Sequence, residues 1–132
     1  MAQVPTLAMN YAGLYFQLSV ALSSVLKKNG FSILEAENGA VGFDVFEENS
    51  DDIDLVLVDW NMPVMTGIEF IEKVRANPAY ENHKLVMVTT ETEPTRMAKA
   101  LMSGVDEFVM KPFTEDILVE KLKLIGVTAA WQ

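Results

Sequence analysis

The chain contains no cysteine, and residues 1–34 contain neither aspartate nor glutamate. Without thiols there can be no disulfide, no thiolate nucleophile and no thiolate metal ligand, so the composition gives no sign of an oxidising compartment. No apolar run approaches the length of a membrane span, and the first residues lack the basic segment of a signal peptide. The sequence therefore predicts a soluble cytoplasmic protein.

Basic residues are also scarce. Ten lysines and arginines stand against 19 acidic residues, which gives a formal net charge of −9. Such a chain repels nucleic-acid phosphates and anionic lipids, so we expect neither direct nucleic-acid binding nor membrane binding. With 132 residues and 50% hydrophobic content, the chain suits one compact domain. We expect a single domain over 1–132, with a core over about 6–125, a short tail at 126–132 and no output domain.

Short apolar runs alternate with segments of helical period, and no linker or low-complexity stretch interrupts them. This alternation is typical of a parallel α/β sheet. The predicted strands lie within 6–12 and over 31–36, 53–58, 85–88 and 108–110. The predicted helices run from Leu18 to Asn29, over 39–48, from Ile68 to a point before Asn77, from about Pro94 onward, and after Thr114.

The last helix is predicted from its cap and its apolar pattern. Thr114 can accept a hydrogen bond from the first turn of the helix. The side chains assigned to the buried side of this helix are Ile117, Leu118, Leu122 and Leu124.

Five strand–helix units joined by right-handed crossovers most simply give a doubly wound (βα)5 fold of the flavodoxin-like type. In this fold a five-stranded parallel sheet lies between two layers of helices. We expect the strand order 2-1-3-4-5, with the site at the switch point beside the first and third strands.

Asp59, Thr89 and Lys111 each follow directly after one of the predicted strands. Because the carboxyl ends of parallel strands meet at one edge of a sheet, we expect these side chains to lie close together. A carboxylate, a hydroxyl and an ammonium in one place form a site that handles an anion, and phosphate is the obvious candidate.

Three stretches around these residues stand at mutually consistent spacing: Asp59-Trp-Asn-Met-Pro-Val-Met-Thr-Gly67, Val88-Thr-Thr-Glu91 and Val109-Met-Lys-Pro-Phe113. Together they resemble the receiver domain of two-component response regulators, and most of all the single-domain chemotaxis type. The resemblance covers about 26–125. It implies a stand-alone signalling protein of a phosphorelay, not an enzyme, that meets a histidine kinase or phosphotransfer protein and an unknown protein target.

The resemblance also implies a role for each site residue. Asp59 would be the phosphoacceptor. Thr89 would bind a phosphoryl oxygen and report its presence, and Phe108 would be the switch aromatic that moves with it. Lys111 would pair with the phosphoryl charge.

Mg²⁺ is the cofactor that the resemblance implies. Asp59 and the backbone carbonyl of Asn61 would bind the metal. Asn61 and Glu91 would tune how fast the aspartyl phosphate hydrolyses.

The family also places two acidic residues at the end of the first strand, and this chain lacks them. One alignment puts Gly13-Leu14 at these positions and another puts Asn10-Tyr11 there, and the next acid along the chain is Glu35. Mg²⁺ normally binds through one or two carboxylates together with the phosphate, so Asp59 alone would hold it poorly. We therefore expect phosphorylation of Asp59 to be slow or undetectable.

Four interpretations remain open. The first is a receiver that still accepts phosphate and signals through the face formed by its fourth helix, fifth strand and fifth helix. The second is a pseudo-receiver that binds proteins through the same surface without phosphorylation. The third, a phosphatase of the haloacid dehalogenase type, is disfavoured, because that family wants an aspartate where this chain has Asn61 and puts its nucleophile on the first strand. The fourth is that residues 1–17 were altered by engineering or a reading error.

Overall fold

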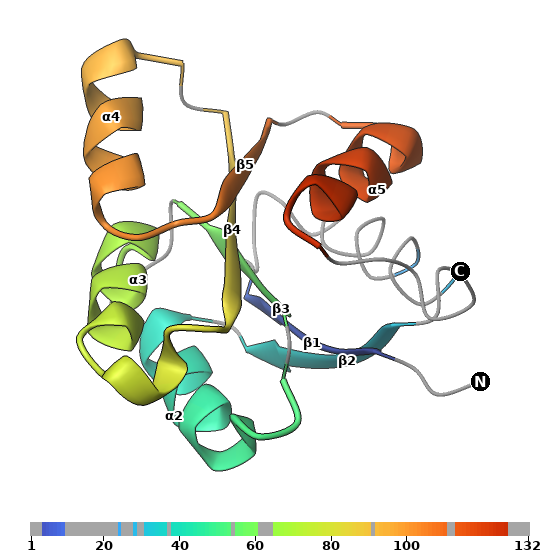
Figure 1. Ribbon diagram of the computed structural model, residues 1–132, viewed down its shortest axis with the longest axis vertical. Coiled ribbons are helices and arrows are strands. Elements are labelled where there is room, and N and C mark those ends of the chain that lie inside the picture. Colours follow the sequence, from blue (N-terminus) through green and yellow to red (C-terminus); the bar gives the residue numbers. More distant parts are fainter. Residues whose placement is uncertain are drawn as a thin grey trace.

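The computed structural model describes residues 4–9, 24, 28, 31–36, 38–53, 55–60, 65–90, 92–110 and 113–126. Its centre is a five-stranded sheet in which every neighbouring pair of strands is parallel. The strands are β1 (Val4–Met9), β2 (Phe31–Ala36), β3 (Leu55–Asp59), β4 (Lys84–Thr89) and β5 (Glu107–Met110). Their order is β2-β1-β3-β4-β5, which confirms the predicted topology (Figure 1).

Helices cover both faces of the sheet (Figure 1). The described helices are α2 (Gly39–Asn49), α3 (Gly67–Arg75), the 3-10 helix η1 (Pro78–Tyr80), α4 (Pro94–Met102) and α5 (Glu115–Leu124). The helices α2, α3 and α4 lie on one side of the sheet, and α5 lies on the other. Among these described helices, none combines the length and apolar character needed to cross a membrane.

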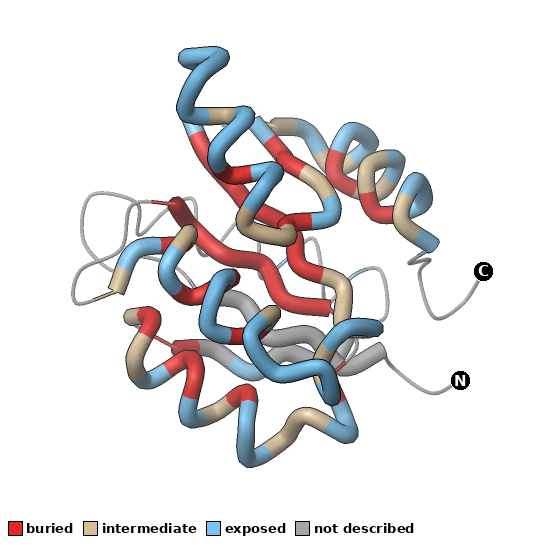
Figure 2. The backbone as a smooth tube through the Cα atoms, turned by 60° about the vertical axis from the view of Figure 1, so that its left-hand side comes forward, coloured by how far each residue is buried: buried red, intermediate tan, exposed pale blue. Residues whose placement is uncertain are grey.

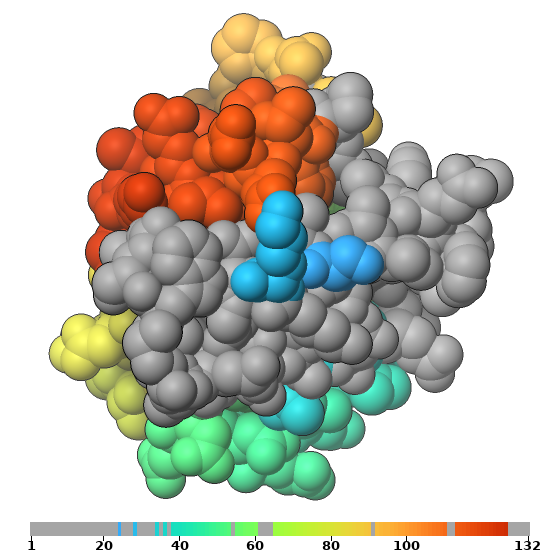
Figure 3. All heavy atoms as spheres, turned by 90° about the vertical axis from the view of Figure 1, so that its right-hand side faces the viewer, coloured from blue at the N-terminus to red at the C-terminus, as the bar shows by residue number. Residues whose placement is uncertain are grey.

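The predicted first helix falls largely outside the described residues. Ser24 and Lys28 are described, and both are helical and exposed. The Lys28 ammonium lies 3.0 Å from a carboxylate oxygen of Glu115, the first residue of α5. In Figure 3, α5 is the orange and red surface on this side of the molecule.

The central strands β3 and β4 are buried on both faces, as the red tubes in Figure 2 show. Val56 and Val58 pack with α2 and α3 in one core cluster, whereas Leu55 and Leu57 pack with α5 in a second cluster. A strand that is covered by helices on both faces needs apolar side chains at successive positions. This is why the sequence of these two strands reads as an unbroken apolar run.

Local sequence sets the starts of the helices. Thr66 caps α3 by accepting a hydrogen bond from the Glu69 amide, and the Glu69 side chain accepts one from the Thr66 amide, which completes a capping box. Pro94 occupies the first turn of α4, where its missing N–H removes no helical hydrogen bond. Thr114 caps α5 by accepting from the Ile117 amide. The predicted starts at Pro94 and Thr114 are confirmed.

The predicted position of the first strand was wrong by a few residues. We predicted it within 6–12, whereas β1 spans Val4–Met9. Pro5 lies within β1, although proline cannot donate a hydrogen bond to a sheet. The register explains why Pro5 is tolerated in this strand, because β1 pairs with β3 only from Thr6 onward. Proline is tolerated at the first residues of a strand.

The predicted buried side of α5 was also wrong in part. Leu118 and Leu122 are buried, but Ile117 is 45% exposed and Leu124 is 69% exposed. Leu118 and Leu122 lie four residues apart and share one helix face, while the neighbouring Ile117 is turned away by about 100°. The apolar pattern of α5 therefore includes side chains that face solvent.

The short 3-10 helix η1 was not predicted from the sequence.

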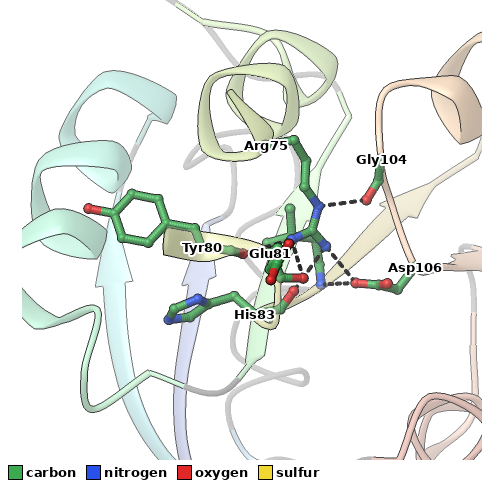
Figure 4. Close-up of polar contacts among 7 residues, drawn as sticks. Arg75, Tyr80, Glu81, His83, Gly104 and Asp106 are labelled. Atoms are coloured by element: carbon green, nitrogen blue, oxygen red, sulfur yellow. Dashed lines mark hydrogen bonds and ion pairs between the residues drawn. The ribbon is translucent and has the colours of Figure 1, made fainter. Parts of the chain in front are cut away.

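The end of α3 is tied to the start of β4 and to the loop before β5 by one side chain, Arg75 (Figure 4). Its guanidinium donates to the carbonyls of Tyr80, at 2.9 Å, His83, at 2.9 Å, and Gly104, at 3.0 Å. It also pairs with a carboxylate oxygen of Asp106 at 2.9 Å. One residue thus fixes the amino-terminal edge of the sheet, opposite the edge where β3 and β4 end.

Candidate functional site

Asp59 and Thr89 lie at the carboxyl ends of neighbouring strands. Asp59 ends β3 and Thr89 ends β4, and the register pairs Asp59 with Val88, the residue before Thr89. Both side chains are 1% exposed, and within the described part of the chain they are the only polar side chains in the buried class. Burying a carboxylate costs free energy unless the surroundings compensate it, so buried acids at a strand end are typical of functional positions.

Phe108 lies on the next strand and is nearly buried, with 8% exposure. It pairs in register with Met87, and Met110 pairs with Thr89. Lys111 directly follows Met110 in the sequence but lies outside the described residues, as do Asn61 and Glu91. The structure thus brings Asp59 and Thr89 to adjacent strand ends and leaves the placement of Lys111, Asn61 and Glu91 as predictions.

Trp60 also lies at this site, although the sequence analysis predicted no role for it. It directly follows Asp59 and is 4% exposed. Its ring stacks on the ring of Phe108, with the centroids 6.5 Å apart and the planes 28° apart. The guanidinium carbon of Arg96 on α4 lies 5.3 Å from the centroid of the Trp60 ring. The signal in the sequence was an aromatic residue beside the predicted phosphoacceptor, but its partners come from distant segments.

The start of α3 packs directly against the backbone of Asp59 and Trp60. The Gly67 amide donates to the Trp60 carbonyl at 3.1 Å. A Cβ at Gly67 would lie 2.8 Å from the Asp59 carbonyl oxygen and 3.0 Å from the Trp60 Cα. Only glycine allows this approach, so the helix helps to fix the strand end that carries Asp59.

We expect Gly67→Ala to lower the free energy of unfolding by about 1–3 kcal/mol, because the added methyl group must push the strand end and α3 apart. Helix propensity alone would give the opposite sign, a stabilisation of up to about 1 kcal/mol. Denaturant unfolding measures the difference. A stabilised variant would show that the backbone near Asp59 yields easily and does not constrain the site.

The described side chains at this edge of the sheet do not by themselves make a complete magnesium site. Mg²⁺ prefers oxygen ligands in an octahedral arrangement and usually takes one or two carboxylates. The described residues contain no group of three or more His, Cys, Asp or Glu side chains that could hold a metal ion. Because β1 ends at Met9, its bounds favour the alignment that puts Asn10-Tyr11 after the first strand, where neither residue is acidic. Within the described part of the chain, Asp59 is the one buried carboxylate.

Comparison with known families decides what kind of domain this is. The family model of the response regulator receiver domain matches residues 17–123. The chain belongs to this family. Receiver domains are signalling proteins, not typical enzymes, and those of the chemotaxis type generally use Mg²⁺. The match begins after β1. Residues 10–14, where this chain lacks the two acidic residues of the family, therefore lie outside the match.

Chemotaxis proteins are among the most similar relatives of this receiver. The CheY homolog of Campylobacter jejuni is 43% identical over 91 residues, which cover 69% of each chain. CheY1 of Helicobacter pylori is 34% identical over 105 residues, which cover 79% of this chain and 84% of the relative. These matches confirm the resemblance to single-domain receivers of the chemotaxis type.

Solved structures give the same fold. CheY4 of Vibrio cholerae superposes with a TM-score of 0.80 at 28% identity and covers 94% of this chain and 99% of its own. A chain of the CheX–CheY–BeF3–Mg complex from Borrelia burgdorferi gives 0.84 at 20% identity, with 96% and 92% covered, and shows the fold alone. The predicted flavodoxin-like fold is confirmed.

Proposed function

We propose that this receiver accepts a phosphoryl group on Asp59 from a histidine kinase or phosphotransfer protein. The observation that carries the proposal is the buried carboxylate of Asp59 at the end of β3, beside the buried hydroxyl of Thr89 at the end of β4. In the transfer, an oxygen of Asp59 forms a bond to phosphorus while the P–N bond of phosphohistidine breaks. The electron pair of that bond stays on the leaving imidazole.

Thr89 and Phe108 form the proposed switch. The Thr89 hydroxyl donates a hydrogen bond to a phosphoryl oxygen, and Lys111, which follows β5, pairs with the phosphoryl charge. Hydrogen bonds to a phosphoryl group are charge-assisted and therefore strong. The shift of Thr89 opens space into which the Phe108 ring moves, and this biases the domain between two packings.

The proposed transfer is slow because the charge of the reacting groups is poorly offset. An anionic carboxylate attacks an anionic phosphoryl group, and such reactions depend on positioning and charge stabilisation. Asp59 and the Asn61 carbonyl leave most of a magnesium shell unfilled, since no acid precedes Glu35. Lys111 compensates in part. Asn61 and Glu91 then tune hydrolysis of whatever aspartyl phosphate forms.

The proposed output surface is formed by α4, β5 and α5. Exposed apolar side chains gather on these elements: Leu101, Met102, Met110, Ile117 and Leu124. Met102 is 88% exposed, although methionine is usually found in cores. Apolar side chains that stay in water on neighbouring elements are typical of protein-binding surfaces. A protein target is the proposed partner of this face.

Intact mass spectrometry after incubation with acetyl phosphate tests the phosphoacceptor. We expect a slowly formed adduct of one phosphate that is absent in Asp59→Asn and that Mg²⁺ accelerates only weakly. Fast formation that depends strictly on Mg²⁺ would contradict the account of the metal site. An adduct that persists in Asp59→Asn would place the phosphoryl group on another residue.

A second candidate function is a pseudo-receiver that binds its target without phosphorylation. The absence of acids before Glu35 favours it. No adduct on the folded protein, together with equal target binding by the wild type and Asp59→Asn, is the outcome that this candidate predicts.

A further inference from the structure

The Trp60 backbone is held from two directions. Its amide donates to the Val88 carbonyl of β4 at 3.2 Å, and its carbonyl accepts from the Gly67 amide of α3 at 3.1 Å. A residue that is tied in this way and 4% exposed has little freedom to move its backbone. Any response of Trp60 to its surroundings is therefore a response of the side chain.

The Trp60 side chain contacts the proposed switch aromatic. The Trp60 and Phe108 rings stack 6.5 Å apart at 28°, a distance and angle at which an aromatic pair is favourable. Phe108 belongs to β5 and therefore reaches the indole from another strand. A change in the packing of Phe108 therefore changes the environment of the Trp60 ring.

The same ring contacts α4 through Arg96. The guanidinium carbon lies 5.3 Å from the ring centroid, within the range of a cation–π interaction, for which tryptophan is the best aromatic partner. Arg96 lies in the first turns of α4, close to Pro94.

Helix α4 has few other apolar contacts in this structure. Ala100 is its one buried residue, and Met97 is half-buried against the same core cluster, while its other residues are exposed. A helix that buries so little apolar surface is weakly held. The contact between Arg96 and Trp60 is thus one of the contacts that hold the amino-terminal half of α4.

We propose that Trp60 is a positioning residue that couples Phe108 to helix α4 through Arg96. With Phe108 packed as it is here, the stacked indole offers its ring to the guanidinium and α4 is held. When Phe108 moves, the indole loses its stacking partner, the contact with Arg96 weakens, and α4 is released. The role of Phe108 as the switch rests on the proposed function, but the coupling itself is a property of the unphosphorylated domain.

Hydrogen exchange of the α4 amides, measured by mass spectrometry on a peptide over 94–102, tests the coupling without any phosphodonor. We expect Arg96→Met to speed exchange of this peptide roughly fivefold, as the loss of one partly exposed cation–π contact implies. Arg96→Lys keeps the cation and should restore much of the protection. Exchange of the α5 peptide over 115–124 should stay unchanged.

A double-mutant cycle separates coupling from simple loosening. We expect Phe108→Leu, which removes the stacking ring, to speed exchange of the α4 peptide severalfold when Arg96 is present and to have little further effect in Arg96→Met. Ala98→Gly loosens α4 through helix propensity at an exposed position outside the core cluster, so its effect should multiply with that of Phe108→Leu.

Two results would overturn the coupling. One is unchanged α4 exchange in Arg96→Met. The other is an effect of Phe108→Leu that is equally large with and without Arg96. Because the cycle is run on the unphosphorylated protein, its failure is distinct from the failure of Asp59 to accept phosphate, which the acetyl phosphate experiment decides.

Discussion

Aspartate at positions 10 and 11 should raise the rate of Asp59 phosphorylation by acetyl phosphate on the order of a hundredfold in the presence of Mg²⁺. The double variant Asn10→Asp/Tyr11→Asp supplies the carboxylates that the chain lacks before Glu35. Two more carboxylates directly after β1, the strand that pairs with β3, would give the hard cation the oxygen ligands it requires. A bound cation that offsets charge in the transition state contributes several kcal/mol, and each 1.36 kcal/mol is a factor of ten in rate.

The matched control for this experiment is Gly13→Asp/Leu14→Asp. It adds the same charge and tests the other alignment of the first strand. Because β1 ends at Met9, we expect the substitutions at 10 and 11, and not those at 13 and 14, to raise both Mg²⁺ affinity and the rate. The rate is followed by intact mass, and Mg²⁺ affinity by calorimetry. Equal rates in the wild type and both variants would show that the missing acids do not limit this receiver.

Arg75→Met should lower the free energy of unfolding by about 3 kcal/mol and the midpoint of thermal unfolding by roughly 10 °C. The Arg75 side chain is 18% exposed and forms an ion pair with Asp106. It also donates to the carbonyls of Tyr80 and His83, which precede β4, and to the carbonyl of Gly104, which precedes β5. Asp106 in turn accepts from the Leu85 amide at 2.8 Å, at the start of β4. Methionine keeps the aliphatic stem but removes the guanidinium from all of these acceptors, and a hydrogen bond to a charged group contributes about 1.5–3 kcal/mol.

Lys73→Met is the control that matches this variant. Lys73 belongs to the same helix, is exposed and lies 4.3 Å over the Phe43 ring, so its loss should cost less than about 1 kcal/mol. Arg75→Lys should recover less than half of the stability, because a lysine ammonium cannot reproduce the planar fork of a guanidinium. If both methionine variants unfold at the same denaturant concentration, the Arg75 network does not hold the sheet edge.

The proposed coupling and part of the proposed output surface lie on one helix, α4. Helix α4 carries Arg96 on the side that meets Trp60 and presents Leu101 and Met102 to solvent. A helix with little buried surface can change position at low cost, while Arg75 holds the Gly104 carbonyl just beyond its carboxyl end. The structure thus combines a carboxyl end held by Arg75 with an amino-terminal half that buries little surface, and the proposed coupling rests on this difference.

The sequence by itself determined the strand order, most element bounds and the positions of Asp59 and Thr89. The physical reason is that these features depend on local or repetitive signals. Strands that are covered on both faces need unbroken apolar runs, caps such as Thr114 act within one turn, and parallel strands must end at a common edge. The missing acids before Glu35 are likewise visible without any coordinates.

Only the tertiary structure decided the partners of Trp60, the network of Arg75 and the exposure of Ile117 and Leu124. Each depends on contacts between segments that are far apart in the sequence. An apolar residue on a helix is buried or exposed according to the direction in which that helix faces the sheet, and its own identity does not fix that direction. The aspartate at the end of β3 could therefore be predicted from the chain alone, whereas the contacts of the neighbouring Trp60 with Phe108 and Arg96 could be found only in the fold.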